Sequence, residues 1–479
     1  MRAETVEKRQ RGLSAVHHSE QKAPGTIVKH ASLDKEDPAA VEDLAQSRAS
    51  VLRNRHFVLL WLAQAVSQTA QNAIWFGLLI VVEERTHSTT QMGFAVLTTI
   101  LPSIFLGMVA GVFVDRLTKN RVLVATNFLR AVVVLGYLLY DRALVLVFLV
   151  NLVSSTITQF FGPAEAAKIP QLVGRRQLIT ANSLFNLTFN GAQLVGMVLL
   201  APPLVKIFGP AAVFTVSAVA FAVAGVLVTQ LPPEPPPTQT LQGLDKSALA
   251  RHMWHDIKEG WQFITSDRRT SLAMLHLTMA SALMLIVAML APRYVVAALG
   301  IRADDAVYVL APAGLGVLVG TTTMSRLAGR FAKEKMVAAG LLAMSVFILL
   351  LSVVRGVADL VLAPALGLLG MHTGVAVVPV VMVFAAVLGL ALSLVIIPSQ
   401  TILMERAPLA SRGRIFSVQM VLGNVASVAP LLFIGTMADL FGVNVVIALL
   451  AVGIFGIWGV STEWFALRIP RRSHGIGDK

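Results

Sequence analysis

Long apolar runs separated by short polar segments dominate the chain from residue 56 onward. A helix needs about 20 apolar residues to cross a bilayer. The backbone of such a segment must satisfy its own hydrogen bonds, so each run is expected to be an α-helix. Twelve runs lie near 56–82, 91–114, 121–140, 143–164, 178–205, 210–231, 270–292, 304–325, 336–354, 376–403, 413–438 and 443–466. The pattern predicts an all-α membrane protein with twelve transmembrane helices in two groups of six.

The segments outside the runs define the expected domain organisation. Residues 1–50 carry both charge signs and no apolar run, so we expect a disordered cytosolic tail. The central break begins with five prolines between Pro232 and Pro237, which predicts a stiff linker start. The expected parts are the tail at 1–50, a six-helix half at 51–231, a cytosolic linker at 232–269, a second six-helix half at 270–466 and a basic cytosolic tail at 467–479.

The linker contains one amphipathic stretch. Around Arg251–Phe263, helical spacing places Trp254, Ile257, Trp261 and Ile264 on one face. This spacing predicts an interfacial helix that lies on the inner leaflet. A plain helical linker is the alternative.

Basic residues alternate in number between successive loops. If the N-terminus is cytosolic, the five inner loops hold eighteen Lys and Arg residues and the outer loops hold six. Inner loops of membrane proteins carry an excess of Lys and Arg, so the bias supports both the span count and this orientation. It also accounts for much of the net charge of +13 without a nucleic-acid partner.

Composition excludes several classes of chemistry. The chain is 56% hydrophobic and 14% charged, whereas soluble domains carry roughly 25% charged residues. Cysteine is absent, which excludes disulfides, thiolate metal sites and cysteine catalysis. A membrane enzyme would need His, Asp or Glu clustered at one depth. Histidine in the apolar runs is nearly limited to His276, with His372 in an outer loop, so we expect no enzyme, cofactor or metal site.

The two groups of helices share repeated features. The pair Arg116-Leu117 follows the second run, and Arg326-Leu327 follows the eighth. Pro163 and Pro398 likewise precede basic segments after the fourth and tenth runs. The two offsets differ because the outer loop Arg355–Val375 is longer than its counterpart Asp141-Arg142. Internal repeats of this kind are typical of secondary transporters.

Several motifs point to a family. The loop after the second run reads Gly111-Val-Phe-Val-Asp115-Arg116, followed by Lys119 and Arg121. The other motifs are Phe161-Gly-Pro-Ala-Glu-Ala-Ala-Lys-Ile-Pro170, Ala181-Asn182-Ser183-Leu184, Glu405-Arg-Ala-Pro408 with Arg412-Gly-Arg414, and Ala438-Asp439-Leu440-Phe441-Gly442. The first motif resembles the loop signature of the major facilitator superfamily. The whole set, over roughly residues 50–466, is similar to its bacterial enterobactin-exporter and macrolide-efflux-like branch.

The resemblance implies two pseudo-repeated six-helix halves around a central cavity, in a bacterial inner cell membrane with both termini cytoplasmic. It implies a conformational gating loop made of Gly111, Asp115, Arg116, Lys119, Arg121, Arg326 and Arg330. Gly111 would let a neighbouring helix approach closely. Asp115 would meet a helix N-terminus or a basic partner in one conformation. The alternative for this loop is a positive-inside anchor only.

The chain departs from the family pattern at two places. Ser325 stands where the second-half loop would carry an acidic residue, which predicts a weaker gating pair there. The fifth helix reads Gly191-Ala-Gln-Leu-Val-Gly196-Met197 and lacks the proline of the drug-antiporter signature. This signature therefore does not support drug–proton antiport, and protons remain only a candidate coupling ion.

Polar residues at membrane depth are costly and usually face a cavity or another helix. Rows at helical spacing in the first, fourth and fifth helices are candidate cavity lining, and the alternative is hydrogen bonding between helices. These candidates are Gln64, Gln68, Asn72, Asn151, Ser155, Thr158, Asn190 and Gln193. Arg130 and Glu165 are candidate buried charges. Arg130 is a candidate to bind an anionic substrate, pair with Glu165 or snorkel, and His276 to carry a proton or pack in the core.

Taken together, these features predict a monomeric secondary active transporter whose partners are a small-molecule substrate and the lipid bilayer. The amide and hydroxyl rows, with Trp61, Trp75 and Phe76 as aromatic surface, suit a weakly charged amphipathic compound such as a drug or siderophore. The efflux-type resemblance implies export. A lysophospholipid or lipid carrier is the nearer alternative, because the apolar outer segment Ala358–Met371 suits lipid contact. A membrane enzyme or a non-transporting membrane partner is a more distant one.

Overall fold

Helices occupy almost all of the chain that the structure describes. The computed structural model describes residues 50–174, 177–234, 251, 255, 258–265, 267–327, 331–361, 373–407 and 412–466. Within these ranges, twelve helices are long and apolar enough to cross a membrane, and no β-strand is present. The predicted fold class and span count are confirmed.

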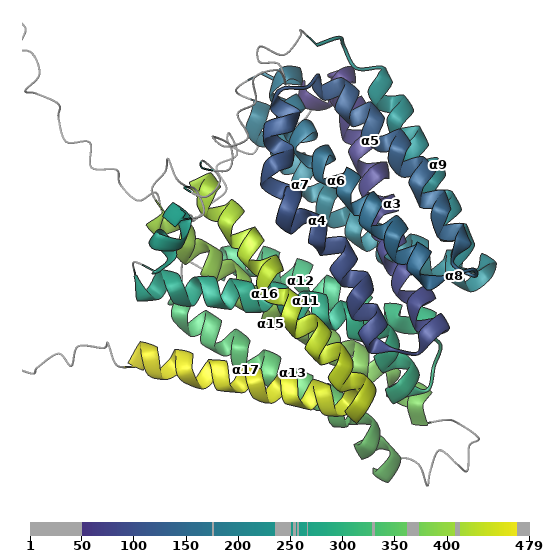
Figure 1. The fold of residues 1–479 in the computed structure, drawn as a ribbon. Helices are drawn as coiled ribbons and strands as arrows, with labels where there is room; N and C mark the ends of the chain where they lie inside the picture. The colour runs from purple at the N-terminus through teal and green to yellow at the C-terminus, as the bar shows by residue number, and fades with distance from the viewer. Residues whose placement is uncertain are drawn as a thin grey trace, which may run out of the picture. The chain divides into compact units, whose positions relative to one another are not determined.

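The first half contains the helices coloured purple to teal in Figure 1. They are α3 (Arg55–Thr86), α4 (Thr89–Asp115), α5 (Lys119–Val134) with η1 (Leu135–Leu139), α6 (Leu144–Leu172), α7 (Leu178–Leu194) with η3 (Val195–Leu200) and α8 (Ala201–Phe208), and α9 (Pro210–Thr229). Helix α3 packs against α9 and α7, and α6 packs against α4 and α5. Side chains define the helix starts: Asn54 accepts the backbone N–H groups of His56 and Phe57.

The second half contains the helices coloured green to yellow in Figure 1. They are α11 (Arg268–Tyr294) with η4 (Val295–Leu299), η5 (Ala303–Ala306), α12 (Val307–Leu327), α13 (Lys333–Val361), α15 (Thr373–Arg406), α16 (Arg412–Phe441) and α17 (Val443–Ala466). Helix α15 packs against α12, α13 and α11, and α13 also packs against α17.

Helices α12 and α15 approach each other through two glycines. A Cβ added to Gly389 would overlap the backbone carbonyl of Ala313, and one added to Gly316 would overlap that of Ala386. Small residues at such crossings let two membrane helices come into backbone contact.

Two predicted regions differ in detail or lie outside the described residues. The predicted outer loop at 355–375 is shorter, because α13 continues through Val361 and α15 begins at Thr373. Arg355 donates to Asp359 one turn later at 2.9 Å, which stabilises this extension. Residues 362–372 of that loop, most of the N-terminal tail and residues 467–479 lie outside the described ranges.

The linker helix is described only in part. Trp254 and Ile257 lie outside the described residues. Trp261 is exposed, whereas Ile264 is buried beside Met274 and Val418. The interfacial orientation and the proposed domain boundaries stay predictions.

Candidate functional site

The two halves are joined at the end of the helix bundle where α4 begins. We name this end the Thr89 end, and the opposite end, where α4 finishes, the Asp115 end. Asp439, near the end of α16, accepts the backbone N–H of Thr89 at 2.6 Å and that of Thr90 at 2.9 Å. The hydroxyls of Ser88 and Thr90 donate to the same carboxylate at 2.7 and 2.6 Å. The first N–H groups of a helix lack intrahelical partners and carry partial positive charge. Asp439 therefore caps a helix of the other half.

A buried ion pair also joins the halves at this end. Arg293 of α11 donates to Glu83 of α3 at 3.2 Å, and the Glu83 side chain is only 1% exposed. The two residues are 210 positions apart, the same offset as the two Arg-Leu pairs of the repeat. Lys206 and Asp305 form a more exposed pair at 3.1 Å. Just outside the spans, Asp304 raises the pKa of the Arg302 guanidinium by a direct hydrogen bond.

Helices α4 and α16 run antiparallel along their contact. A Cβ on Gly435 would meet the backbone of Thr89, and one on Gly93 would meet the carbonyl oxygen of Leu431 at 3.3 Å. Further along, the Asn424 amide donates to the Ser103 hydroxyl at 2.9 Å. The two halves are thus in close contact from the Thr89 end toward the middle of these helices.

The gating-loop residues lie at the Asp115 end. Asp115 and Arg121 are exposed, and Arg116 and Lys119 are partly exposed. The Lys119 ammonium donates to the Asp115 carbonyl at 3.1 Å. A Cβ on Gly111 would meet nothing within 4 Å, so the close helix approach expected there is absent from this conformation. The side chain of Arg326 and all of Arg330 lie outside the described residues.

Hydrogen bonds at the Asp115 end stay within one half, as far as both partners are described. Beside the first half, the Asn120 amide donates to the carbonyl of Pro232, the first linker residue, at 2.7 Å. In the second half, Lys333 pairs with Glu405, and Arg406 pairs with Asp267. Between described residues, the cross-half hydrogen bonds and ion pairs therefore lie on the Thr89 side and mid-way along α4.

The predicted polar rows divide into buried and half-buried members. Asn151 is buried, accepts the Tyr137 hydroxyl at 2.9 Å and donates to Ala95, Thr98 and Thr99. These contacts match the alternative interpretation, hydrogen bonding between helices. Gln64 and Ser155 are also buried, whereas Gln68, Asn72, Thr158 and Gln193 are half-buried and Asn190 is exposed.

One contact links the rows of α3 and α6. The Thr158 hydroxyl lies 3.5 Å from the Gln71 amide oxygen and donates to the Ser154 carbonyl at 2.9 Å. Asn72 donates to the Gln68 carbonyl one turn earlier. The half-buried members of the rows and the exposed Asn190 are therefore the ones with surface left for a ligand.

Arg130 is buried inside the first half and does not snorkel. Its guanidinium donates to the Ser67 hydroxyl at 3.0 Å, the Asn127 amide oxygen at 2.9 Å and the Thr126 carbonyl at 3.3 Å. The rings of Phe161 and Phe221 lie 4.4 and 4.5 Å from it. Stacking of a guanidinium on aromatic faces is stabilising where water is excluded.

Two other side chains singled out from the sequence have defined places. His276 is buried and its Nε2 lies 2.9 Å from the Ser461 hydroxyl, which links α11 to α17. Among the aromatic residues, Phe76 is buried in the core, and the Trp61 indole donates to Thr188 at 2.7 Å. The ring of Phe76 is therefore not available as ligand surface.

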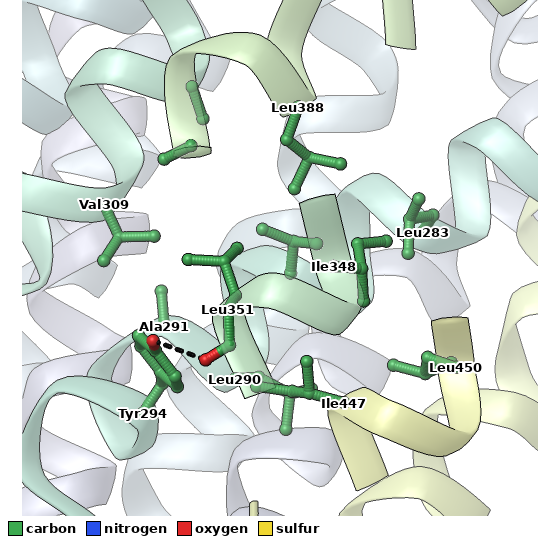
Figure 2. Close-up of a pocket in the computed structure, with 13 residues that line it drawn as sticks. Leu283, Leu290, Ala291, Tyr294, Val309, Ile348, Leu351, Leu388, Ile447 and Leu450 are labelled. Carbon is green, nitrogen blue, oxygen red and sulfur yellow. Dashed lines mark hydrogen bonds between the residues drawn. The ribbon is translucent and has the colours of Figure 1, made fainter. Parts of the chain in front are cut away.

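Figure 2 shows a small apolar cavity inside the second half. Its walls come from α11, α12, α13, α15 and α17, and its volume is about 50 Å³. The Tyr294 hydroxyl beside it donates to the Leu351 carbonyl at 2.9 Å. Sites for drug-sized ligands are several times larger, roughly 300–1,000 Å³. The cavity is a packing void between helices and too small for a transported compound.

A family model described as Major Facilitator Superfamily matches residues 60–383. The chain belongs to the major facilitator superfamily. The superfamily predicted from the loop motif is confirmed, and the chain is a multi-pass membrane transporter.

Three curated relatives in this superfamily are of bacterial origin. The uncharacterized MFS-type transporter YkuC of Bacillus subtilis (strain 168) is 31% identical over 31% of this chain and 35% of its own length. The enterobactin exporter EntS of Shigella dysenteriae serotype 1 (strain Sd197) is 27% identical over 57% of this chain and 64% of its own. The chain spans less than two thirds of these two. The uncharacterized MFS-type transporter YfiS of B. subtilis (strain 168) is 24% identical over 74% of this chain and 80% of its own.

Solved structures of other transporters share the fold at low identity. The nucleoside transporter NupG matches with a TM-score of 0.65 and 11% identity, over 85% of this chain and 98% of its own. A bacterial homologue of the human lysosomal transporter Spinster matches with a TM-score of 0.65 and 11% identity, over 90% of this chain and 99% of its own.

The residues that join the halves have no role that follows from the sequence motifs. Asp439 stands within the motif Ala438–Gly442, and Glu83 and Arg293 stand in none. The offset of 210 between Glu83 and Arg293 was a usable signal, because it places opposite charges at repeat-related positions.

Proposed function

We propose that this superfamily member is a secondary active transporter that works by alternating access and exports a small amphipathic compound, drug-like or siderophore-like. The observation that carries the proposal is the one-sided joining of the halves. Asp439 and the Glu83–Arg293 pair connect them at the Thr89 end. Contacts of this kind break without unfolding either half, which alternating access requires.

The orientation of the described conformation belongs to the same proposal. With both termini cytoplasmic, the Asp115 end faces the cytoplasm and the joined Thr89 end faces outward. An epitope tag fused after Lys479 is expected to be reached by antibody in inside-out vesicles and not in intact spheroplasts. Labelling of that tag from outside the cell would contradict this topology.

The substrate class follows from the surface that α3 and α6 leave half-buried. Gln68, Asn72 and Thr158 offer amides and a hydroxyl, and Trp75 is half-buried nearby in sequence. The Nε and Nη2 groups of Arg130 donate to neutral partners, and the rings of Phe161 and Phe221 cover the guanidinium, so most of this charge is turned away from a ligand. Such a lining suits a mostly apolar ligand with a few hydrogen-bonding groups. The name of EntS, an enterobactin exporter, supports export of a siderophore-like compound.

The test is accumulation of hydrophobic dyes, macrolides and enterobactin in cells with and without the protein. We expect lower accumulation with the protein, and a several-fold loss of this effect in Gln68→Ala. Gln230→Ala, at an exposed position after α9, is the matched control and should behave as wild type. Unchanged accumulation together with saturable uptake of a polyanionic metabolite would overturn both substrate class and direction. Movement of a fluorescent lysophospholipid alone in reconstituted vesicles would favour the lipid-carrier alternative.

A further inference from the structure

Glu165 of α6 has a carboxylate oxygen that is closed to solvent and unpaired. Its Oε1 has no hydrogen-bond partner among the described residues. The residue lies one turn after Phe161, whose ring covers Arg130. A carboxylate oxygen that is buried without a hydrogen-bond partner is costly when the group is ionised, and ionisable groups inside membrane segments are most often functional.

Arg130 is the charged group close enough to act on Glu165, but it makes no ion pair with it in this conformation. Its Nε and Nη2 groups donate to Thr126, Ser67 and Asn127, all neutral groups. An arginine keeps its proton under all physiological conditions, so of the two residues only Glu165 changes charge. Proton binding at Glu165 would change the pair from net neutral to a single buried cation.

Other titratable groups on the helices packed against α6 lie near the ends of those helices. Lys168, on α6 itself, donates to the Gln171 amide at 3.2 Å. The remaining groups on α4, α5 and α3 are Asp115, Lys119, Arg121, Arg55, His56, Glu83, Glu84 and Arg85, and α7 has none between 178 and 194. On η1 the neutral Tyr137 hydroxyl donates to Asn151 of α6. Arg130 is thus the charge at depth that Glu165 meets.

The repeat provides an internal control for this pair. Counted from the first residue of each helix, Met344 stands at the same position in α13 as Arg130 in α5. Both side chains are buried. The tenth helix reads Pro398-Ser399-Gln400 where the fourth reads Pro163-Ala164-Glu165. The second half therefore folds with a methionine and the neutral isostere of glutamate at these positions. A six-helix half of this fold therefore forms without charges at these two positions.

We propose that Glu165 binds the proton that couples transport to a proton gradient, with Arg130 as its fixed counter-charge. This rests on the proposed transport function and names its coupling ion. In the conformation described here, protonation of Glu165 removes its negative charge and leaves the positive charge of Arg130 without a counter-charge. In a conformation that admits water beside α6, the water hydrates the Arg130 cation. Glu165 then binds the proton with a different affinity. A ligand whose affinity differs between two conformations shifts their populations, and this links proton binding to conformational change.

Infrared difference spectroscopy of the reconstituted full-length protein tests the proposal without a substrate. The wild type is expected to show a carbonyl band of a protonated carboxylic acid that disappears as pH rises. The band should be absent from Glu165→Gln and present in Glu405→Gln, which removes an exposed carboxylate of the other half. A band that persists unchanged in Glu165→Gln would overturn the proposal, whatever the transport assays give.

Proteoliposomes loaded with ethidium separate coupling from transport itself. In Glu165→Gln, the stimulation of ethidium movement by a pH gradient should fall about tenfold or more. Exchange of ethidium across the membrane at equal pH should be retained. If the single variant folds poorly, Arg130→Met/Glu165→Gln reproduces the residues of the second half and should behave likewise. Full stimulation by a pH gradient in either variant would overturn the proposal. Wild-type protein that moves no ethidium in either assay would count against the proposed substrate class, and the infrared titration would then decide on Glu165 alone.

Discussion

The carboxylate of Asp439, near the C-terminal end of α16, accepts the backbone N–H of Thr89, the first residue of α4, at 2.6 Å. The two helices are antiparallel, and Asn424 meets Ser103 further along. Twelve residues beyond that contact stand Asp115, the last residue of α4, and Arg412, the first of α16. Each helix therefore has an aspartate at or near its C-terminal end, and that of α16, Asp439, caps the start of α4. In the described conformation the Asp439 contact is made and the Asp115 side chain is exposed.

Replacement Asp439→Asn should weaken the joint at the Thr89 end. Hydrogen bonds to a charged group are worth about 1.5–3 kcal/mol, so we expect a roughly tenfold or larger shift toward conformations open at this end. Because the chain has no cysteine, spin labels placed by Arg142→Cys and Val445→Cys report the separation of the halves directly. The distance distribution should gain a longer component.

Asp141→Asn is the matched control for that measurement. Asp141 lies at the same end but pairs with Arg85 of its own half. Its loss should leave the distance distribution unchanged. Equal effects of the two substitutions would show that Asp439 has no special role in joining the halves.

Asp115→Asn should slow transport without affecting expression or thermal stability. The side chain is exposed here, and exposed substitutions usually change stability by less than about 0.5 kcal/mol. In the opposite conformation we expect it to cap the start of α16, so its loss removes stabilisation from that state alone. The ratio of transport rate to expressed protein is the readout. Wild-type rates would leave Asp115 as a topology anchor only.

The Glu83–Arg293 pair should be asymmetric in its effect on stability. Glu83 is 1% exposed and Arg293 is 27% exposed, so removing the arginine leaves the more deeply buried charge unpaired. Breaking a buried pair from one side costs about 3–5 kcal/mol. We expect Arg293→Gln to lower the Tm of the purified protein more than Glu83→Gln. The double variant should recover part of the loss, and additive losses would contradict direct coupling.

Gly389→Ala should destabilise the second half by overpacking α12 against α15. The new methyl group would overlap the carbonyl of Ala313, and overpacking of this kind costs about 1–3 kcal/mol. Gly453→Ala is the control, because a Cβ there meets nothing within 4 Å. A Tm drop for Gly389→Ala of several degrees relative to Gly453→Ala is expected. Equal Tm values would mean that the helices separate without cost.

Much of the helical architecture could be predicted because membrane spans are a local property. An apolar run of sufficient length must become a helix in lipid, whatever its neighbours. All twelve runs correspond to spans, with ends that differ by up to eight residues. The helix continues past the predicted loop start at Arg355, because this guanidinium bonds to Asp359 and to the Leu299 carbonyl.

The sequence alone determined the span count, the superfamily motif and the position of the Gly111–Arg121 loop, because each depends only on residues that are close together in the sequence. Only the tertiary structure decided which polar residues meet. Glu83 lies 210 residues from Arg293 and Thr89 lies 350 from Asp439, and their pairing depends on how the two halves dock. The surroundings of Arg130 and Glu165 likewise come from four helices at once. No periodicity along one helix encodes such contacts, because they depend on the rotation and depth of each helix relative to the others.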